Sequence, residues 1–142
     1  MRESKKGLVF IDTNVFLRAI VKEDEQTFNE CLSFLKAVSD EKIKAITSTL
    51  VFMEINFVLL SFYKFPKEKV QQVLESILDL PHLKIVDIFD MREAIEIYKK
   101  TKIKFVDCLL ASLLKKKDFK IVSYDLDFDK LKIERLSPKD FA

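Results

Sequence analysis

The chain has 142 residues, of which 49% are hydrophobic and 34% are charged, and its formal net charge is +2. That length fits a single domain, here residues 1–142, whose core is large enough to need neither a disulfide nor a structural metal. The single Gly excludes a glycine-rich phosphate loop. One His, and two Cys without CxxC spacing, exclude a multi-histidine or zinc-finger site. Any chemistry must therefore fall mainly on the 23 carboxylates.

The sequence contains no segment typical of membrane insertion or secretion. The longest apolar stretch, residues 50–62, is shorter than the roughly 20 apolar residues that a membrane span needs. The apolar run at residues 8–11 is too short for the core of a signal peptide. The two Cys residues have no disulfide framework around them, as is usual in a reducing compartment. We expect a soluble, cytoplasmic protein without membrane contacts.

Short apolar runs alternate with helical periodicity along the chain. The runs predict five strands, at residues 8–11, 43–47, 83–88, 120–123 and 131–136. The first and fourth are apolar almost throughout, which is typical of central strands, whereas the fifth alternates like an edge strand. Apolar spacings and start signals predict helices from near Asn14, over 25–38, from Ser48 to about 63, from Pro66 to about 78, over 91–99 and over 105–117. This alternation predicts an α/β fold with a mainly parallel sheet.

Four acidic residues occupy positions where carboxylates are unusual. Asp12 and Asp125 follow the two predicted central strands. Glu54 interrupts a helix that is apolar nearly all round, and Asp107 shares a helix face with apolar residues. Ligands of parallel α/β sheets bind beyond the carboxyl ends of the strands, so all four side chains can meet at one end of the sheet.

Taken singly, each of these acids also has an ordinary structural explanation. Asp12 fits the N-cap of the helix that follows it, and Asp125 fits a turn after a strand. Asp107 fits a first-turn acid that complements the helix dipole. Glu54 fits an ion pair with one Lys or Arg, since an ionised side chain on an apolar helix needs a partner.

Taken together, four converging carboxylates indicate a cation. Two carboxylates 4 Å apart repel each other by about 4 kcal/mol at an effective dielectric constant near 20, so such a cluster persists only around positive charge. Oxygen ligands without His or Cys favour Mg²⁺ or Mn²⁺ over zinc. Divalent ions bound by carboxylates suit phosphoryl transfer, where they activate a water and stabilise the attacking and leaving oxygens.

Four segments contain these acids in order along nearly the whole chain. They are FIDTN at residues 10–14, TSTLVFMEI at 47–55, FVDCLLASL at 105–113 and IVSYDLDFDKL at 121–131. Together they resemble the motifs of PIN-domain ribonucleases, and the size of the chain is similar to that of the VapC toxins of toxin–antitoxin pairs. The resemblance implies a three-layer α/β/α sandwich on a parallel sheet of four or five strands, and a homodimer.

The same resemblance implies an activity and partners. The implied activity is that of an endoribonuclease which hydrolyses RNA phosphodiester bonds with one or two Mg²⁺ or Mn²⁺ ions and leaves a 5′ phosphate. The implied protein partner is a cognate antitoxin whose C-terminal segment occupies the acidic groove. A small antitoxin gene beside the gene for this chain is therefore expected.

The resemblance also assigns roles to individual residues. The catalytic, metal-binding acids of the family fall on Asp12, Glu54, Asp107 and Asp125, and polar positions that support them fall on Thr13, Asn14 and Ser123. Asp127 lies where many relatives have a further acid, which makes it an additional candidate ligand; a solvent-facing turn residue explains it equally well. Tyr124 departs from the family pattern, because smaller residues are common beside this acid, and it would reshape the rim of the pocket.

A lysine-rich segment surrounds one of the candidate ligands. Residues 99–120 contain eight Lys and two Asp. Lys102, Lys104, Lys115 and Lys116 are therefore candidates for contacts with RNA phosphates at the rim of the acidic pocket. The alternative is a solvated helix face on which the lysines at 115–117 complement the negative end of the helix.

Two other functions compete with the nuclease interpretation. The first is a catalytically silent PIN-like module that binds RNA or protein, which a metal-dependent cleavage assay would distinguish. The second is a phosphoaspartyl protein, such as a receiver domain or a haloacid-dehalogenase-type phosphatase. That chemistry needs a second acid close to Asp12, and the neighbouring Thr13 and Asn14 do not supply one.

Overall fold

Five short parallel strands form the central sheet of the protein. They are β1 (Val9–Ile11), β2 (Ala45–Thr47), β3 (Leu83–Ile85), β4 (Lys120–Val122) and β5 (Arg135–Leu136). Their order in the sheet is β3-β2-β1-β4-β5, and each neighbouring pair is parallel. The computed structural model describes residues 8–141, so residues 1–7 and 142 of the single domain expected over 1–142 lie outside it. Within the described range, all five predicted strands and the parallel sheet are confirmed, but β3 and β5 are shorter than the predicted 83–88 and 131–136.

The order of the strands agrees with the burial of their side chains. All residues of β1 and β2 are buried, and so are Ile121 and Val122 of β4. A strand that is apolar on both faces is favourable only where helices cover both faces, as at the centre of this sheet. The residues of β3 are largely exposed at one edge, and β5 forms the other edge, as its alternating sequence predicts.

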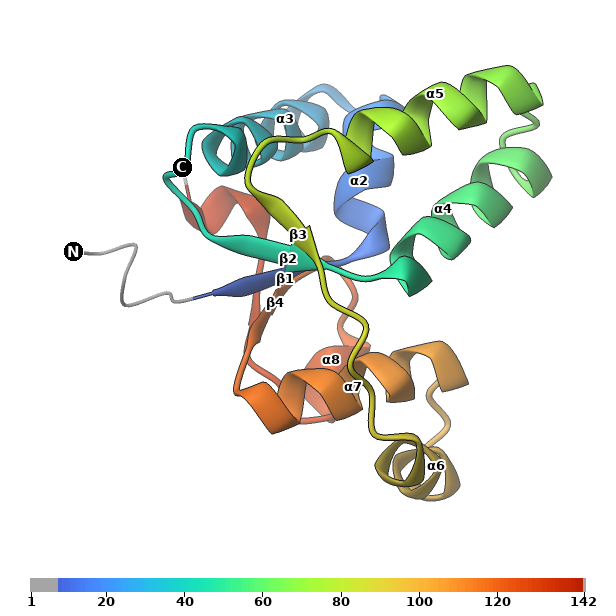
Figure 1. Ribbon diagram of the computed structural model, residues 1–142, viewed down its shortest axis with the longest axis vertical. Helices are drawn as coiled ribbons and strands as arrows, with labels where there is room; N and C mark the ends of the chain where they lie inside the picture. The colour runs from blue at the N-terminus through green and yellow to red at the C-terminus, as the bar shows by residue number, and fades with distance from the viewer. Residues whose placement is uncertain (1–7, 142) are drawn as a thin grey trace.

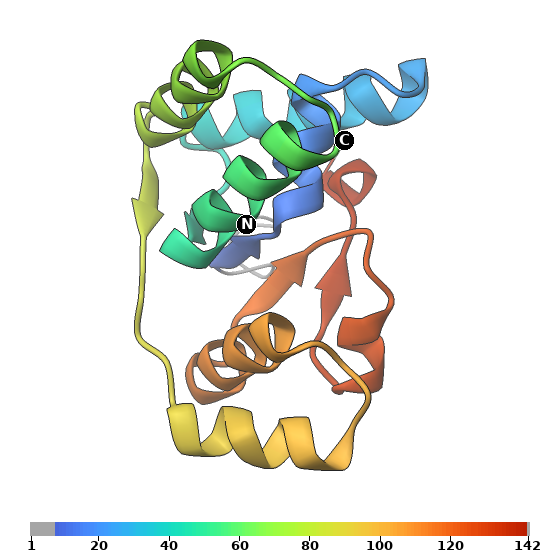
Figure 2. The same ribbon diagram turned by 90° about the vertical axis from the view of Figure 1, so that its right-hand side faces the viewer.

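Helices cover both faces of the sheet and complete the predicted three-layer α/β/α sandwich (Figure 1). The first layer contains α2 (Thr13–Ile20), α3 (Glu25–Ser39), α4 (Thr49–Ser61) and α5 (Lys67–Leu78). The opposite layer contains α6 (Met91–Lys100), α7 (Phe105–Lys117) and the short α8 (Asp127–Lys130), as the turned view in Figure 2 also shows. A 3-10 helix, η1 (Pro138–Phe141), follows β5 and packs against α3.

The six longer helices are those that the sequence predicts, with small differences at their ends. Helix α7 covers the predicted residues 105–117. Ser48 caps α4, because its Oγ accepts a hydrogen bond from the Leu50 amide at 3.0 Å. Pro66 lies one residue before α5 rather than in its first turn. Helices α8 and η1 are not predicted, because four residues are too few to show a helical period.

Among the helices of residues 8–141, none combines the length and the apolar character needed to cross a membrane.

The carboxyl ends of β1 and β4 lie side by side at the centre of the sheet, because these strands are parallel neighbours. Asp12 directly follows β1, and the segment from Ser123 to Asp125 follows β4. Two of the four candidate acids therefore start from adjacent points of the backbone.

Candidate metal centre and active site

Asp12 is held at the end of β1 by three hydrogen bonds. Its Oδ1 accepts the Thr13 amide at 2.8 Å, so Asp12 does cap α2. Its Oδ2 accepts the Ser123 hydroxyl at 2.7 Å and Asn14 Nδ2 at 3.3 Å. Burial, with only 4% of the residue exposed, raises the pKa of Asp12 from 3.8 to about 6 even though these hydrogen bonds act to lower it. Asp12 is thus both a helix cap and an acid in an environment that disfavours its charge.

The Ser123 hydroxyl connects the end of β1 to the loop that follows β4. It donates to Asp12, and it accepts Asn14 Nδ2 at 3.1 Å and the Asp125 amide at 2.9 Å. One donated and two accepted bonds use the full capacity of a hydroxyl group. Asn14 Oδ1 accepts the Tyr124 amide at 3.2 Å. The polar residues expected to support the acids therefore fix both Asp12 and the backbone that carries Asp125.

Asp107, in the first turn of α7, is buried without a complete set of partners. Only 2% of the residue is exposed, and its Oδ2 makes no hydrogen bond with any residue of the described range 8–141. Burial raises the pKa of Asp107 from 3.8 to about 7; the positive charge of Lys104 opposes this rise, and the negative charges of Asp12 and Asp125 add to it. A buried oxygen without a donor is costly, and complementing the helix dipole does not require burial. The position of Asp107 therefore needs a further explanation.

Asp107, Asp125 and Asp127 form a cluster with the spacing of a cation site. One carboxylate oxygen from each residue lies within 4.8 Å of the other two. Asp127 begins α8, and its amide donates to Asp125 Oδ1 at 2.9 Å, which holds these two acids next to each other. The additional candidate Asp127 thus lies within the cluster; Asp12 and Glu54 are not part of it, but their negative charges act on Asp107. We call these three residues the aspartate cluster.

Glu54 is partly buried on α4, and both of its carboxylate oxygens have partners. The Thr13 hydroxyl donates to Oε1 at 2.8 Å, and Lys104 Nζ donates to Oε2 at 3.1 Å. Partial burial lowers the pKa of Lys104, but the negative charges of Asp107, Glu54 and Asp12 outweigh this effect and raise it. The ion-pair explanation for Glu54 is therefore correct, and its lysine partner lies among the candidate acids.

The four lysines considered as RNA contacts separate into two groups. Lys102 and Lys104 precede α7, at the end of the helix that carries Asp107. Lys115 lies eight residues after Asp107, which corresponds to about 12 Å along the helix axis. Lys116 follows it and donates to Asp90 Oδ2 at 3.0 Å. The helix therefore carries Lys115 and Lys116 to its far end, away from Asp107, and their contact with RNA stays a prediction.

Sequence reasoning overlooks Arg135, which supports the loop of the site. Arg135 lies on β5 and donates to the Ser123 carbonyl at 3.0 Å and to Asp129 Oδ1 at 3.1 Å. It thereby fixes the backbone just before Asp125. A charged residue in an alternating edge strand is the only signal in the sequence, and it does not predict this contact.

The Tyr124 hydroxyl contacts the Cys31 thiol on α3 at 3.4 Å.

The donor set of the aspartate cluster fits a hard divalent cation. It offers carboxylate oxygens, which Mg²⁺ and Mn²⁺ prefer, and contains no His or Cys. The buried Oδ2 of Asp107 lacks a partner that a cation would provide. A cation would also stabilise the ionised forms of Asp12 and Asp107, which burial and, after it, the neighbouring negative charges disfavour. The residues present can therefore hold such an ion.

Comparison with known proteins agrees with this geometry. The family model of the PIN domain matches residues 9–134. The chain is 30% identical over 129 residues to a VapC ribonuclease of Aquifex aeolicus (strain VF5), an alignment that covers 90% of this chain and 95% of that protein.

Solved structures share the fold at lower sequence identity. A toxin–antitoxin complex from Klebsiella pneumoniae matches with a TM-score of 0.63 and 15% identity, covering 92% of this chain and 97% of that one. VapC20 of Mycobacterium tuberculosis, a sarcin–ricin loop cleaving toxin, matches with a TM-score of 0.64 and 16% identity, covering 88% and 95%. The match to the family model and the identity to the Aquifex protein show that the chain belongs to the PIN-domain family and is a homologue of the VapC ribonucleases.

Proposed function

We propose that the protein is a metal-dependent endoribonuclease and the toxin of a toxin–antitoxin pair, acting in the cytoplasm. The observation that carries the proposal is the aspartate cluster with the buried, unpartnered Oδ2 of Asp107. Family membership and the likeness to a ribonuclease and to an RNA-cleaving toxin support it. The reaction is hydrolysis of an RNA phosphodiester bond, which leaves a 5′ phosphate and a 3′ hydroxyl. An RNA substrate and two free buried cysteines agree with a cytoplasmic location.

We propose Mg²⁺ or Mn²⁺ as the cofactor, held by Asp107, Asp125 and Asp127 beside Asp12 and Glu54. When bound, such an ion supplies Lewis acidity, which activates water and offsets the charge that develops at the phosphate. The chain itself holds the acids in fixed directions before substrate arrives. Asp12 is held by three hydrogen bonds, and Thr13 fixes Glu54. Groups fixed in advance need no reorganisation during the reaction.

Lys102 and Lys104 are the RNA contacts that we propose at the rim of the acids. Both are exposed and precede α7, so they lie at the end of the helix where the acids gather. Positive side chains beside an acidic pocket attract the phosphate backbone and offset the repulsion between the acids and RNA. Their contribution to binding is electrostatic and does not depend on base identity.

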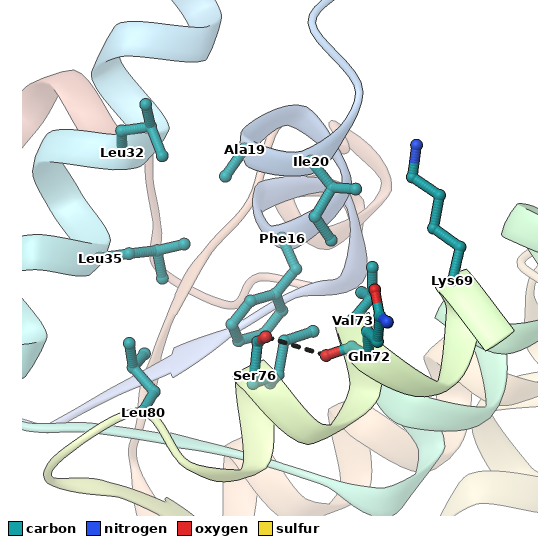
Figure 3. Close-up of a pocket in the computed structure, with 11 residues that line it drawn as sticks. Phe16, Ala19, Ile20, Leu32, Leu35, Lys69, Gln72, Val73, Ser76 and Leu80 are labelled. Carbon is teal, nitrogen blue, oxygen red and sulfur yellow. Dashed lines mark hydrogen bonds between the residues drawn. The ribbon is translucent and has the colours of Figure 1, made fainter.

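An apolar groove between α2, α3 and α5 is the surface that we propose for the antitoxin. The cavity in it measures about 380 Å³. Figure 3 shows side chains from all three helices around it, among them Phe16, Leu35 and Val73, with Lys69 at its edge. A groove of this kind receives the apolar face of an amphipathic helix. Helix α2 also begins at Thr13, so a ligand that extends along it reaches the acids.

The outer face of α4 is the surface that we propose for a homodimer. Met53, Phe57 and Phe62 expose 62%, 67% and 72% of their surface. Met53 and Phe57 are four residues apart and so share one face of the helix. Large apolar side chains grouped in this way mark an interaction surface. A second copy of the chain would cover this face with the same residues, as a two-fold symmetric contact requires.

Replacing the buried acids should abolish cleavage. Asp12→Asn and Asp107→Asn remove the charge at nearly constant shape, so RNA cleavage in Mg²⁺ should fall by at least about 100-fold, the effect of losing several kcal/mol of charge stabilisation. Asp118→Asn is the matched control, because Asp118 is an exposed residue with φ 55°, a conformation that Asn accepts readily. Gel assays of RNA cleavage with Mg²⁺ or EDTA measure the effect. Full activity of Asp107→Asn, or activity that survives EDTA, would contradict the proposal.

Without metal, the stability of the protein should fall as the pH rises from about 5 to 8. The pKa values of Asp12 and Asp107 in the folded state, about 6 and about 7, exceed the ordinary value of 3.8. Raised carboxyl pKa values contribute stability that is complete below about pH 3.8 and is lost as the pH rises through 6 and 7. Each pKa unit corresponds to about 1 kcal/mol, so the Tm in EDTA should drop by roughly 5 °C or more.

The control for the pH effect is Asp107→Asn, whose amide does not titrate. In EDTA this variant should depend less on pH than the wild type and should have the higher Tm at pH 8. Mg²⁺ should raise the Tm of the wild type at pH 8 and leave that of the variant nearly unchanged. Scanning calorimetry at both pH values measures these shifts. Equal wild-type stability at pH 5 and pH 8 in EDTA would count against raised pKa values of the buried Asp12 and Asp107.

A charge in the groove should weaken antitoxin binding. Leu32 lines the groove and is 42% exposed, so Leu32→Arg should fold and should reduce affinity for the neighbouring gene's product by at least about tenfold. Leu78→Arg is the matched control, because Leu78 lies on α5, is 58% exposed and is not part of the groove lining. Calorimetric titration measures binding. Equal affinity of the Leu32 variant and the wild type would reject this groove as the antitoxin surface.

A charge on the outer face of α4 should separate the dimer. Phe57→Asp should shift the protein to the monomer, because burying an unpaired carboxylate in an apolar interface is unfavourable. Met91→Asp serves as the control, since Met91 is similarly exposed, at 54%, but begins α6 in the opposite helical layer. Light scattering over a range of concentrations gives the mass. A monomeric wild type, or a Phe57 variant that remains dimeric, would argue against this interface.

A further inference from the structure

Lys104 places a fixed positive charge beside the acids of the site. It is the residue directly before α7, three positions ahead of Asp107. Its Nζ donates to Glu54 Oε2 at 3.1 Å, from a side chain that is 57% exposed. Asp107, Glu54 and Asp12 all act on this ammonium group electrostatically. One lysine is therefore in range of acids that come from three different elements of the fold.

The acids around Lys104 differ in whether their oxygens are already satisfied. Both oxygens of Glu54 have partners within the chain, Thr13 and Lys104. The buried Oδ2 of Asp107, a residue of the aspartate cluster, has none among residues 8–141. Glu54 is not part of that cluster. Lys130 Nζ lies 3.4 Å from Asp127 Oδ1, so the chain also places a lysine beside the aspartate cluster. The two places still differ, because Glu54 has both oxygens satisfied by the chain and Asp107 keeps a buried oxygen without a donor among the described residues.

We propose that the Lys104 ammonium takes the place of a second divalent cation, so that the site binds one ion, at the aspartate cluster. The inference rests on the proposed metal site and concerns the number of ions that it accepts. A second ion at Glu54 would have to displace Lys104. It would then lie close to the first ion, and two divalent charges repel each other twice as strongly as one divalent charge and an ammonium at the same distance.

The exposed side of Lys104 agrees with this role. An ammonium group has three hydrogen-bond donors, and the bond to Glu54 uses one of them. The remaining donors are available to an oxygen of the RNA phosphate. Lys104 therefore supplies at this position a positive charge that touches both an acid of the site and the substrate. Unlike a metal ion, this charge cannot dissociate from the chain.

The number of bound ions tests the proposal directly. Mn²⁺ is titrated into the whole chain, without RNA, and free Mn²⁺ is followed by electron paramagnetic resonance. The wild type should bind one ion tightly. Lys104→Met keeps most of the length of the side chain but removes its charge, so it should bind a second ion at least about tenfold more tightly than the wild type does. Lys104→Arg should restore a single tight site, and Lys117→Met, in the exposed last turn of α7, should behave as the wild type.

A double variant identifies the position of the second ion. Lys104→Met combined with Glu54→Gln should return to one tight site, because the carboxylate exposed by removing Lys104 is then absent. Two equally tight ions in the wild type, or no second ion in Lys104→Met, would overturn the inference about Lys104 while one metal site remained. A wild type that binds no Mn²⁺ would instead reject the proposed metal site, and this inference with it.

Discussion

The burial of several carboxylates at one end of the sheet is the constraint on which the arrangement of the site depends. Asp12 and Asp107 are both nearly fully buried, and the charges of Glu54 and Asp125 act on each of them. Burial and like charge both favour the protonated acids, so bringing these residues together raises their pKa values. Near neutral pH such a group of acids lowers stability wherever it is ionised. The fold tolerates it because a cation can compensate the charge.

The parallel sheet allows this concentration of charge, because it brings both helical layers to the ends of the same strands. Asp12 and Asp125 follow the neighbouring strands β1 and β4. Glu54 comes from α4 in one helical layer, and Asp107 comes from α7 in the other. The acids therefore meet across all three layers. The hydrogen bonds of Ser123 make the direction of Asp12 depend on the pairing of β1 with β4, so sheet and site are built together.

The sequence predicts the local features of this arrangement far better than its long-range contacts. Strands and helices such as α7 are predictable because apolar runs and helical spacings are properties of neighbouring residues. The pairing of Glu54 with Lys104 joins residues 50 positions apart, and that of Asn14 with Ser123 spans 109. Neither has a local signal. Lys115 is the reverse case. It is near Asp107 in sequence, but the rise of the helix places it far from Asp107 in space.

Lys104 has two opposing effects on a metal ion. Its positive charge lowers the pKa of Asp107 and so favours the ionised ligand that a cation requires. The same charge repels any cation that approaches Glu54. Because the pKa of Asp107 is about 7 without metal, a divalent ion at the aspartate cluster competes with a proton for this carboxylate near neutral pH. A lysine at this position lowers the pKa of Asp107, so that protons compete less with a metal ion at the aspartate cluster. Its own ammonium group competes with a metal ion for Glu54. Both effects favour a single ion, bound at the aspartate cluster rather than at Glu54.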